Sequence, residues 1–228
     1  MTEIKTTNIP RRQKCVNKEH PYIGGAADVI DDELQLTQAQ INAIVLGDAV
    51  SISLNASPSP IFVGVQSTIN LAASISTPAD SIKIKKGSTE IATGSGQSLS
   101  GTDAITPSQD GNTTYTAEFV LGGLTKTTSK NVAAVYPIRI GSGAAYVEGT
   151  ALTTPKTSPA GTYNVVVAQN EDYVFFNVPA TMTINRAIMS GFEFPLESPE
   201  SVTIGGIAYK SYKSSNTYDA GTLTIVIS

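Results

Sequence analysis

Histidine, cysteine and tryptophan are almost absent from this sequence of 228 residues, which has one His, one Cys and no Trp. A single Cys excludes a disulfide bond within the chain. A zinc site needs four ligands in a tetrahedral array, and Cys15 with His20 supplies only two. Serine-hydrolase chemistry would have to use His20, and the sequence has no Gly-x-Ser-x-Gly turn. We therefore expect no catalytic residues, no metal site and no cofactor.

An excess of positive charge and long apolar runs are missing as well. The chain has 15 Lys and Arg against 19 Asp and Glu, which gives a net charge of −4. Nucleic-acid binding needs a basic face that neutralises phosphates, so we expect no nucleic-acid partner. No run approaches the ~18 apolar residues of a membrane helix, and no apolar segment of a secretion signal follows the N-terminal basic residues. We expect no membrane contact and a protein that is made in the cytoplasm.

The first 20 residues are polar and basic, with five Lys and Arg against two Glu. Pro10 and Pro21 bias the residues before them toward extended geometry, and Gly24-Gly25 forms a flexible joint. We therefore predict an extended attachment arm over residues 1–25. A disordered terminus without a function fits the same composition, and both interpretations stay open on composition alone.

One short helix of about ten residues is predicted in the segment 26–48; residues 31–47 hold it, and Asp31, Asp32 and Glu33 lie just upstream of its start. Thr37 and Gln40 form a capping box, and Gly47 is a typical C-terminal stop. A helix of this length is too short to be stable alone in water, so it must pack against its own chain or against a symmetry mate. The candidate contacts between copies are Leu36, Ile41, Ile44 and Val45.

From Val50 onward the hydrophobic period changes from 3.6 to 2, which is typical of strands with one buried face. Residues 50–54, 68–71 and 81–85 alternate between apolar and polar, and turn residues such as Asp110-Gly111 separate these runs. Several short strands over about 85 residues are typical of an immunoglobulin-like (Ig-like) sandwich. We predict this fold for residues 49–136.

Two features of the Ig-like region give more specific predictions. Tyr115 follows a turn and opens a strand, as in a tyrosine corner, so we expect its hydroxyl to bond to backbone upstream. Lys83, Lys85 and Lys86 lie on a strand that we predict to be an edge, where charges prevent aggregation between sheets.

Residues 137–228 form a second β-region, predicted to be a β-sandwich-like module. It holds ten of the 15 aromatic residues, so we expect it to have its own core. Gly205-Gly206 predicts a two-residue hairpin turn, and the last strand should be central to a sheet or to a contact between copies. The predicted fold class is thus all-β with an extended N-terminal arm and one short helix. The expected strands of the second region are Tyr163–Val167, Tyr173–Val178, Met182–Ile184, Val202–Ile204, Ile207–Tyr212 and Thr222–Ile227.

Carboxylate pairs need separate attention, because glycosidases work with two acids and no His. Glu171 and Asp172 are adjacent, so their side chains should point apart. Three more acids lie in the Pro-rich loop 191–200, which could bind a sugar or a partner. Alternatively, Phe192 and Phe194 anchor a solvated loop to the core. No acid pair stands out as catalytic.

Several short segments resemble modules of bacteriophage fibre proteins. In the second β-region these are residues 172–180 (DYVFFNVPA), residues 189–194 (MSGFEF) and the Y-x-x-Y-x-S motif at 209–214. The Ig-like region, with residues 80–87 and 115–119, is similar to linker modules in fibres of Bacteroides phages, including the crAss-like group. Residues 8–12 and 16–22 resemble the attachment arm of a short head fibre.

The resemblance implies a non-enzymatic structural protein of the virion. It would form a homotrimeric fibre that decorates the phage capsid, with the arm bound to a capsid protein and the C-terminal module pointing outward. The implied attachment residues are Ile9, Pro10, Arg11, Arg12, Lys14 and Tyr22.

Two alternatives stay open beside the head fibre. One is a tail-associated fibre of the same build, and the other is an adhesin that binds host-surface glycans. A depolymerase is disfavoured, because the sequence lacks a repeating β-helix pattern. The candidate glycan contacts of the adhesin are Tyr209, Tyr212, Tyr218 and Glu193.

Overall fold

The structure is a computed structural model, and it describes residues 30–31, 36–37 and 50–228. The arm predicted over residues 1–25 lies outside the described residues, as does most of the predicted helix. Ile30–Asp31 (β1) and Leu36–Thr37 (β2) pair antiparallel. These residues lie upstream of the predicted helix or at its cap, Thr37, so the helix after the cap lies outside the described residues and stays a prediction. No helix of the described part of the chain is long and apolar enough to cross a membrane.

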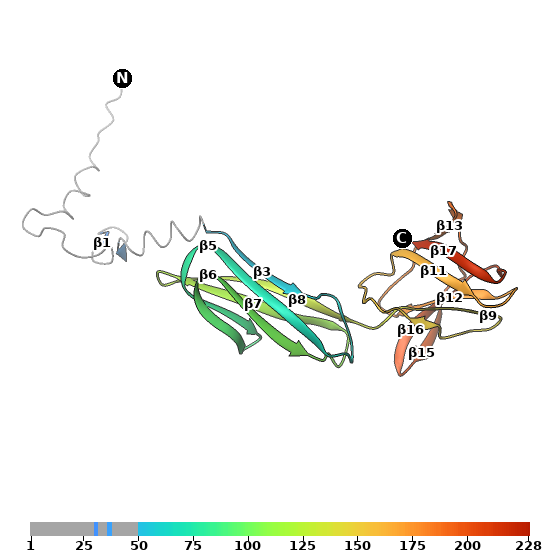
Figure 1. Cartoon of the computed structure of the whole chain (residues 1–228), viewed down its shortest axis with the longest axis horizontal. Coiled ribbons are helices and arrows are strands. Elements are labelled where there is room, and N and C mark those ends of the chain that lie inside the picture. The colour runs from blue at the N-terminus through green and yellow to red at the C-terminus, as the bar shows by residue number, and fades with distance from the viewer. Residues whose placement is uncertain (1–29, 32–35, 38–49) are drawn as a thin grey trace, which may run out of the picture. The chain divides into compact units, whose positions relative to one another are not determined.

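Residues 52–135 form six strands that pair into one continuous sheet (Figure 1). The strand order is β3-β5-β7-β8-β4, and β6 pairs with β5. The strands are Ile52–Ser57 (β3), Ile61–Phe62 (β4), Ser67–Lys86 (β5), Thr89–Ile105 (β6), Gly111–Leu121 (β7) and Leu124–Val135 (β8).

Alternating burial explains why these segments form strands. In the first half of β5, Ile69, Leu71, Ala73 and Ile75 are buried, and the residues between them are exposed. Successive side chains of a strand point to opposite faces, so this pattern buries one face of the sheet. The change to a period of two that the sequence predicts after Val50 is confirmed.

The six-stranded sheet is curled. β3 and β4 lie at opposite ends of the strand order, yet only residues 58–60 separate them in the chain. Four strand spacings in a flat sheet would put them about 19 Å apart, which exceeds the roughly 14 Å that a link from 57 to 61 can span. β4 pairs in parallel with β8, at Ile61 and Ala134. The predicted all-β class with an Ig-like sandwich is confirmed.

The described residues divide into two compact units. One holds the described residues up to 56 together with 70–103 and 114–130, and the other holds 57–69, 104–113 and 131–228. β8 ends at Val135 and β9 begins at Arg139. The domain boundary predicted between residues 136 and 137 falls between these strands and stays a prediction.

The three lysines at the end of β5 do not protect an edge. This half of β5 pairs with β7, and β6 also pairs with β5. Each ammonium group instead pairs with a carboxylate on a neighbouring strand, which replaces the predicted edge role. The pairs are Lys83–Glu90 at 3.4 Å, Lys85–Glu118 at 2.6 Å and Lys86–Asp103 at 2.6 Å.

Tyr115 is fully buried, but its hydroxyl does not bond to upstream backbone as a tyrosine corner would. It donates to Asp103 Oδ2 at 2.8 Å, the same oxygen that pairs with Lys86. The predicted backbone acceptor is therefore wrong, because a carboxylate from β6 occupies that place. Burial, the hydrogen bond to Asp103 and the charge of Asp103 raise the pKa of the Tyr115 hydroxyl.

Residues 139–227 fold into two further sheets (Figure 1). The five-stranded sheet has the order β10-β9-β12-β16-β15, and the four-stranded sheet has the order β11-β17-β13-β14. The strands are Arg139–Gly143 (β9), Thr150–Ala151 (β10), Gly161–Val167 (β11), Tyr173–Pro179 (β12), Ala187–Met189 (β13), Phe192–Glu193 (β14), Glu200–Ile204 (β15), Ile207–Lys213 (β16) and Gly221–Ile227 (β17).

A single apolar cluster fills the module of residues 138–228. It includes Val174 and Phe176 of β12 and Ile225 of β17. Five of the six predicted strands are present, and β17 lies between β11 and β13 as expected for a central strand. The strand predicted at 182–184 is wrong: Met182 and Ile184 are apolar because they fill the core from a loop.

The hairpin turn predicted at Gly205-Gly206 joins β15 to β16. Both glycines have positive φ, at 57° and 82°. A two-residue turn of this kind needs positive φ at both central positions, which glycine adopts without a steric penalty. The prediction is confirmed.

Replacing Tyr115 with Phe should lower the free energy of unfolding by about 2 kcal/mol, because a buried hydrogen bond to a charged acceptor is lost. The pKa of the Tyr115 hydroxyl is higher in the folded than in the unfolded state. Its contribution to stability is therefore fully present below pH 10 and is lost as the pH rises further. The stability difference between wild type and variant should therefore shrink above pH 10. Urea denaturation at a series of pH values measures this, with Tyr136→Phe as the control. Equal stability of the two proteins at pH 7 would contradict the prediction.

Candidate functional site

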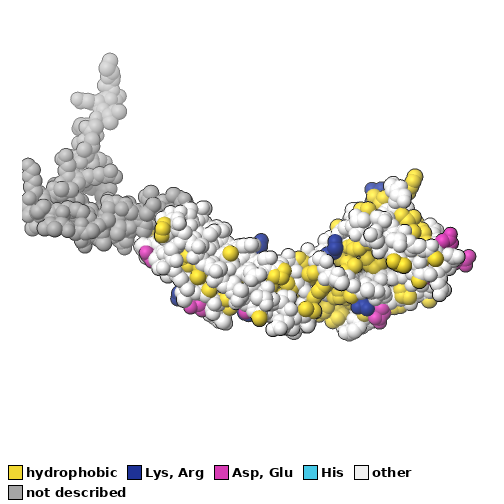
Figure 2. Space-filling view, viewed as in Figure 1, with side chains coloured by type: hydrophobic (Ala, Val, Ile, Leu, Met, Phe, Trp, Pro, Cys, Tyr) yellow, Lys and Arg dark blue, Asp and Glu magenta, His cyan; other side chains and the backbone are white. Residues whose placement is uncertain are grey.

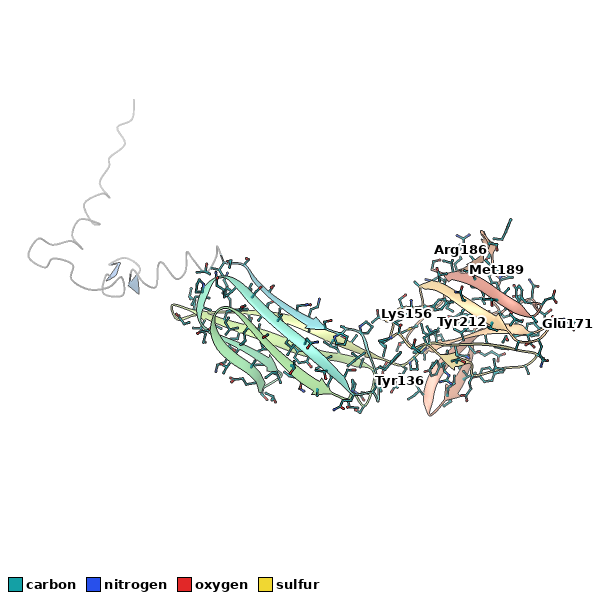
Figure 3. All side chains as sticks on the ribbon, in the orientation of Figure 1. Tyr136, Lys156, Glu171, Arg186, Met189 and Tyr212 are labelled. Carbon is teal, nitrogen blue, oxygen red and sulfur yellow. The ribbon has the colours of Figure 1, made fainter. Side chains whose placement is uncertain are left out.

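Tyr209 and Tyr212, two of the predicted glycan contacts, are buried side chains of β16. Each is 4% exposed. The Tyr209 hydroxyl donates to Pro137 O at 3.0 Å, and the Tyr212 hydroxyl accepts the N–H of Ile184 at 3.2 Å. Figure 3 labels Tyr212 among the strands of the module. Both hydroxyls thus bond within the module, and the two glycan contacts stay predictions.

Tyr218 and the loop after β13 form an aromatic contact. The rings of Tyr218 and Phe194 are stacked, with centroids 5.1 Å apart and an interplanar angle of 15°. Phe194 is 2% exposed and anchors the loop, as one of the two interpretations of the loop expected, whereas Phe192 is 78% exposed. Burial raises the pKa of the Tyr218 hydroxyl. Glu193 is exposed in β14.

A hollow of about 250 Å³ lies beside residues 193–199, and we call it the loop hollow. Its lining includes Glu193, Tyr212 and Arg186. The structure thus brings two of the four predicted glycan residues to one hollow, while the other two do not line it. Arg186, which Figure 3 labels, exchanges two backbone hydrogen bonds with Ser228, at 3.2 and 3.0 Å.

The remaining acids and metal-ligating residues do not converge in the described part of the chain. Asp172 is 5% exposed, and its Oδ2 accepts the N–H of Gln169 at 3.2 Å, while Glu171 is exposed with φ of 64°. The pair therefore shapes a turn. Among the described residues no group of three or more His, Cys, Asp and Glu could hold a metal ion. Cys15 and His20 lie outside those residues.

A larger groove, of about 580 Å³, runs along β11, and we call it the β11 groove. Residues 162–166 of β11 form one wall. Residues 140–142 of β9 and residues 149–152 around β10 form the other. All of its lining side chains are uncharged. The sequence does not indicate this groove, because its walls come from segments about 20 residues apart.

β11 is the outermost strand of its sheet, so one of its edges has no partner strand within the described residues. Ser142 meets part of this edge: its hydroxyl donates to Val166 O at 3.2 Å and accepts the N–H of Ala168 at 3.1 Å. Alternate residues of a strand direct their backbone groups to the same side. The N–H and C=O of Thr162 and Asn164 therefore face the β11 groove.

The segment 144–149 covers the outer face of the five-stranded sheet. Asn177 on β12 donates two hydrogen bonds to it, from Nδ2 to Val147 O at 2.9 Å and to Glu148 O at 3.0 Å. Glycine at position 141 permits this cover, because a Cβ there would lie 2.8 Å from the Cα of Gly149. Gly141 and Gly143 lie within β9, and their lack of a Cβ lets a loop lie against the sheet.

The remaining predicted contact residues lie mostly outside the described residues. Leu36 is in β2, and its pairing with Asp31 is the only contact described for it. The other positions that lie outside the described residues are Ile9, Pro10, Arg11, Arg12, Lys14, Tyr22, Ile41, Ile44 and Val45.

Comparison with known proteins identifies no family. No known protein family matches the sequence, and no curated protein matches it. Among solved structures, the fibronectin(III)-like modules of Clostridium thermocellum CbhA are similar to this chain at 17% sequence identity. That similarity covers 77% of this chain and 92% of the other, with a TM-score of 0.33. The description of the fold therefore depends on the sheets themselves.

Replacing Gly141 with Ala should lower the free energy of unfolding by about 1–3 kcal/mol, because the new Cβ would press on the backbone of Gly149. Thermal denaturation measures the effect. Gly94→Ala is the matched control, since its Cβ would meet only the end of the Leu99 side chain, at 3.0 Å. A smaller loss for Gly141→Ala than for Gly94→Ala would contradict the packing of segment 144–149 on β9.

Proposed function

We propose that the chain is a structural protein of a phage virion, a homotrimeric fibre that decorates the capsid. The arm over residues 1–25 anchors it to a capsid protein, and the C-terminal module points outward. The resemblance to phage fibre modules suggests this role. The observation that supports it best is the edge of β11, which Ser142 meets only in part and which offers a surface for association with another chain.

β11 lacks the features that usually prevent pairing between edges. Its sequence, GTYNVVV, has no charge and no proline, and edge strands without these features associate readily with other chains. Val166 on β11 is 67% exposed, and Val226 on the adjacent strand is 41% exposed. Figure 2 shows hydrophobic side chains exposed on this module. The edge and its apolar neighbours together form a surface suited to a second copy.

A trimer needs a contact between two different surfaces of neighbouring copies, repeated around a threefold axis until the ring closes. An edge strand can supply one of these surfaces, because its free N–H and C=O groups pair with an extended segment of a neighbour. The contacts predicted at Leu36, Ile41, Ile44 and Val45 would add a second association site in this proposal.

The trimer is tested by light scattering on the purified chain, which should give three times 23.8 kDa. Asn164→Pro removes an N–H that faces the groove and leaves the pairing of β11 with β17 intact, and Val166→Lys adds a charge at the edge. Both variants should remain folded and have a lower mass. Thr203→Lys, on the exposed edge strand β15, should remain trimeric. A trimer that tolerates both β11 variants would contradict this contact, and a monomeric wild type would contradict the fibre.

Deletion of residues 1–22 tests the anchoring role of the arm. The truncated protein should stay soluble and keep its oligomeric mass, yet no longer bind phage particles in co-sedimentation. Full-length protein added to the same particles is the control. A truncated protein that still decorates particles would contradict the attachment through the arm. A labelled antibody on intact virions would distinguish a head fibre from the tail-associated alternative.

The adhesin alternative is favoured by a different observation. The C-terminal module has hollows on both sides of the segment 195–200, and Glu197 and Ser198 border both of them. Small polar hollows on a rigid β-module are suited to binding part of a larger ligand. The adhesin would be a fibre whose outer module recognises the host surface.

A further inference from the structure

A hollow of about 200 Å³ lies on the outer face of the five-stranded sheet, and we call it the outer hollow. It is separate from the loop hollow and contains none of the predicted glycan residues. The side chains that matter in its lining are Tyr146, Phe175, Glu197, Glu200, Ser211 and Lys213. Four of these belong to β12, β15 and β16, so paired strands hold them in place.

The strand register aligns these polar groups in a row. Asn177 of β12 lies opposite Ser211 of β16, which lies opposite Glu200 of β15. Directly paired residues project from the same face of a sheet. In the next row Phe175 lies opposite Lys213, beside the hydroxyl of Ser211. A carboxylate, a hydroxyl and an ammonium group thus converge on one side of the sheet.

Ser211 is the middle residue of the first polar row and borders the outer hollow. Its residue is 5% exposed, and its hydroxyl has no hydrogen-bond partner among the described residues although it borders the hollow. Its neighbour across the strand, Asn177, has a buried Oδ1 without a partner. Of the two atoms only Asn177 Oδ1 is buried without a partner, and Asn177 does not line the hollow, whereas the Ser211 hydroxyl borders it and is available to a ligand.

The charged groups of the outer hollow are pre-arranged. Lys213 Nζ lies 3.1 Å from Glu197 Oε1 and 4.0 Å from the centroid of the Tyr173 ring. Two contacts of this kind hold the ammonium group in place. Glu200 is exposed and forms no ion pair within the described residues.

An aromatic ring completes the hollow. Tyr146 packs edge-to-face on Phe175, with ring centroids 6.0 Å apart and an interplanar angle of 85°. Phe175 is 3% exposed and supports the ring, whereas Tyr146 is 45% exposed. The Tyr146 ring therefore presents apolar surface beside the polar row, and its hydroxyl can donate or accept a hydrogen bond.

We infer that the outer hollow binds one neutral sugar ring. Sugar hydroxyls both donate and accept, so they match carboxylates, a serine hydroxyl and an ammonium group at once. The C–H face of the ring would lie on Tyr146. Glu197 and Glu200 disfavour anionic ligands, and Lys213 disfavours a simple amine. The inference rests on the adhesin alternative and deepens it, because it moves the glycan site away from Tyr209 and Tyr212.

Titration of the full-length protein by NMR tests the inference, with the methyl glycosides of glucose, galactose, mannose and N-acetylglucosamine as probes. At least one should bind with Kd on the order of 1 mM, the affinity expected for a ligand of about a dozen non-hydrogen atoms. Glucuronic acid and butylamine should each bind at least tenfold more weakly. No binding of any glycoside at 50 mM, or tighter binding of the acid or the amine, would overturn the inference.

Variants distinguish a binding role from a structural one. Ser211→Ala should weaken sugar binding about fivefold and leave the thermal midpoint unchanged or higher, since a hydroxyl without a partner is removed. Tyr146→Ala should abolish binding, and Glu200→Gln should reduce the discrimination against glucuronic acid. Thr203→Ala, on the same strand as Glu200 and on the opposite face, is the control. Sugar binding that is unchanged in Ser211→Ala, or that persists in Tyr146→Ala, would overturn the inference, whatever the oligomeric state or particle binding shows.

Discussion

The burial of β12 on both faces is the constraint on which the C-terminal module depends. Val174, Phe176 and Val178 project into the sandwich core, and Phe175 and Asn177 project toward the opposite face. A strand with one face in solvent would need buried residues only at the three core-facing positions. Because both faces of β12 must be covered, the chain supplies a second sheet on one side and the segment 144–149 on the other.

The cover on the outer face creates the surfaces that are relevant to function. Glycine at 141 lets the segment 144–149 approach β9, and Asn177 binds that segment through two backbone carbonyls. Residues 144–146 of this cover border the outer hollow, beside Lys213 and Ser211. Ser142, which also belongs to β9, bonds to part of the β11 edge and leaves the rest of that edge facing the β11 groove. The proposed sugar site and the proposed contact at the β11 edge thus both depend on β9 and on the segment 144–149 that follows it.

Local patterns predicted much of the fold. The period of two after Val50, five of six C-terminal strands and the turn at Gly205-Gly206 depend on neighbours in the sequence, so they could be predicted. Met182 and Ile184 have the apolar pattern of a strand, but core filling from a loop selects the same residue types. Tyr115 was predicted to be anchored by its hydroxyl, yet its partner, Asp103, lies on another strand. The partner could not be inferred because it depends on strand pairing.

Residue type and spacing alone specify the β class, the alternation of buried positions and the basic character of the first 20 residues. Which polar side chains are accessible depends instead on how distant segments pack. Tyr209 and Ser211 are two residues apart on the same strand and the same face, yet one hydroxyl bonds to Pro137 O and the other borders a hollow. The segments that cover these two residues are far from them in the sequence, so the spacing of residues within the strand cannot predict which hydroxyl is covered.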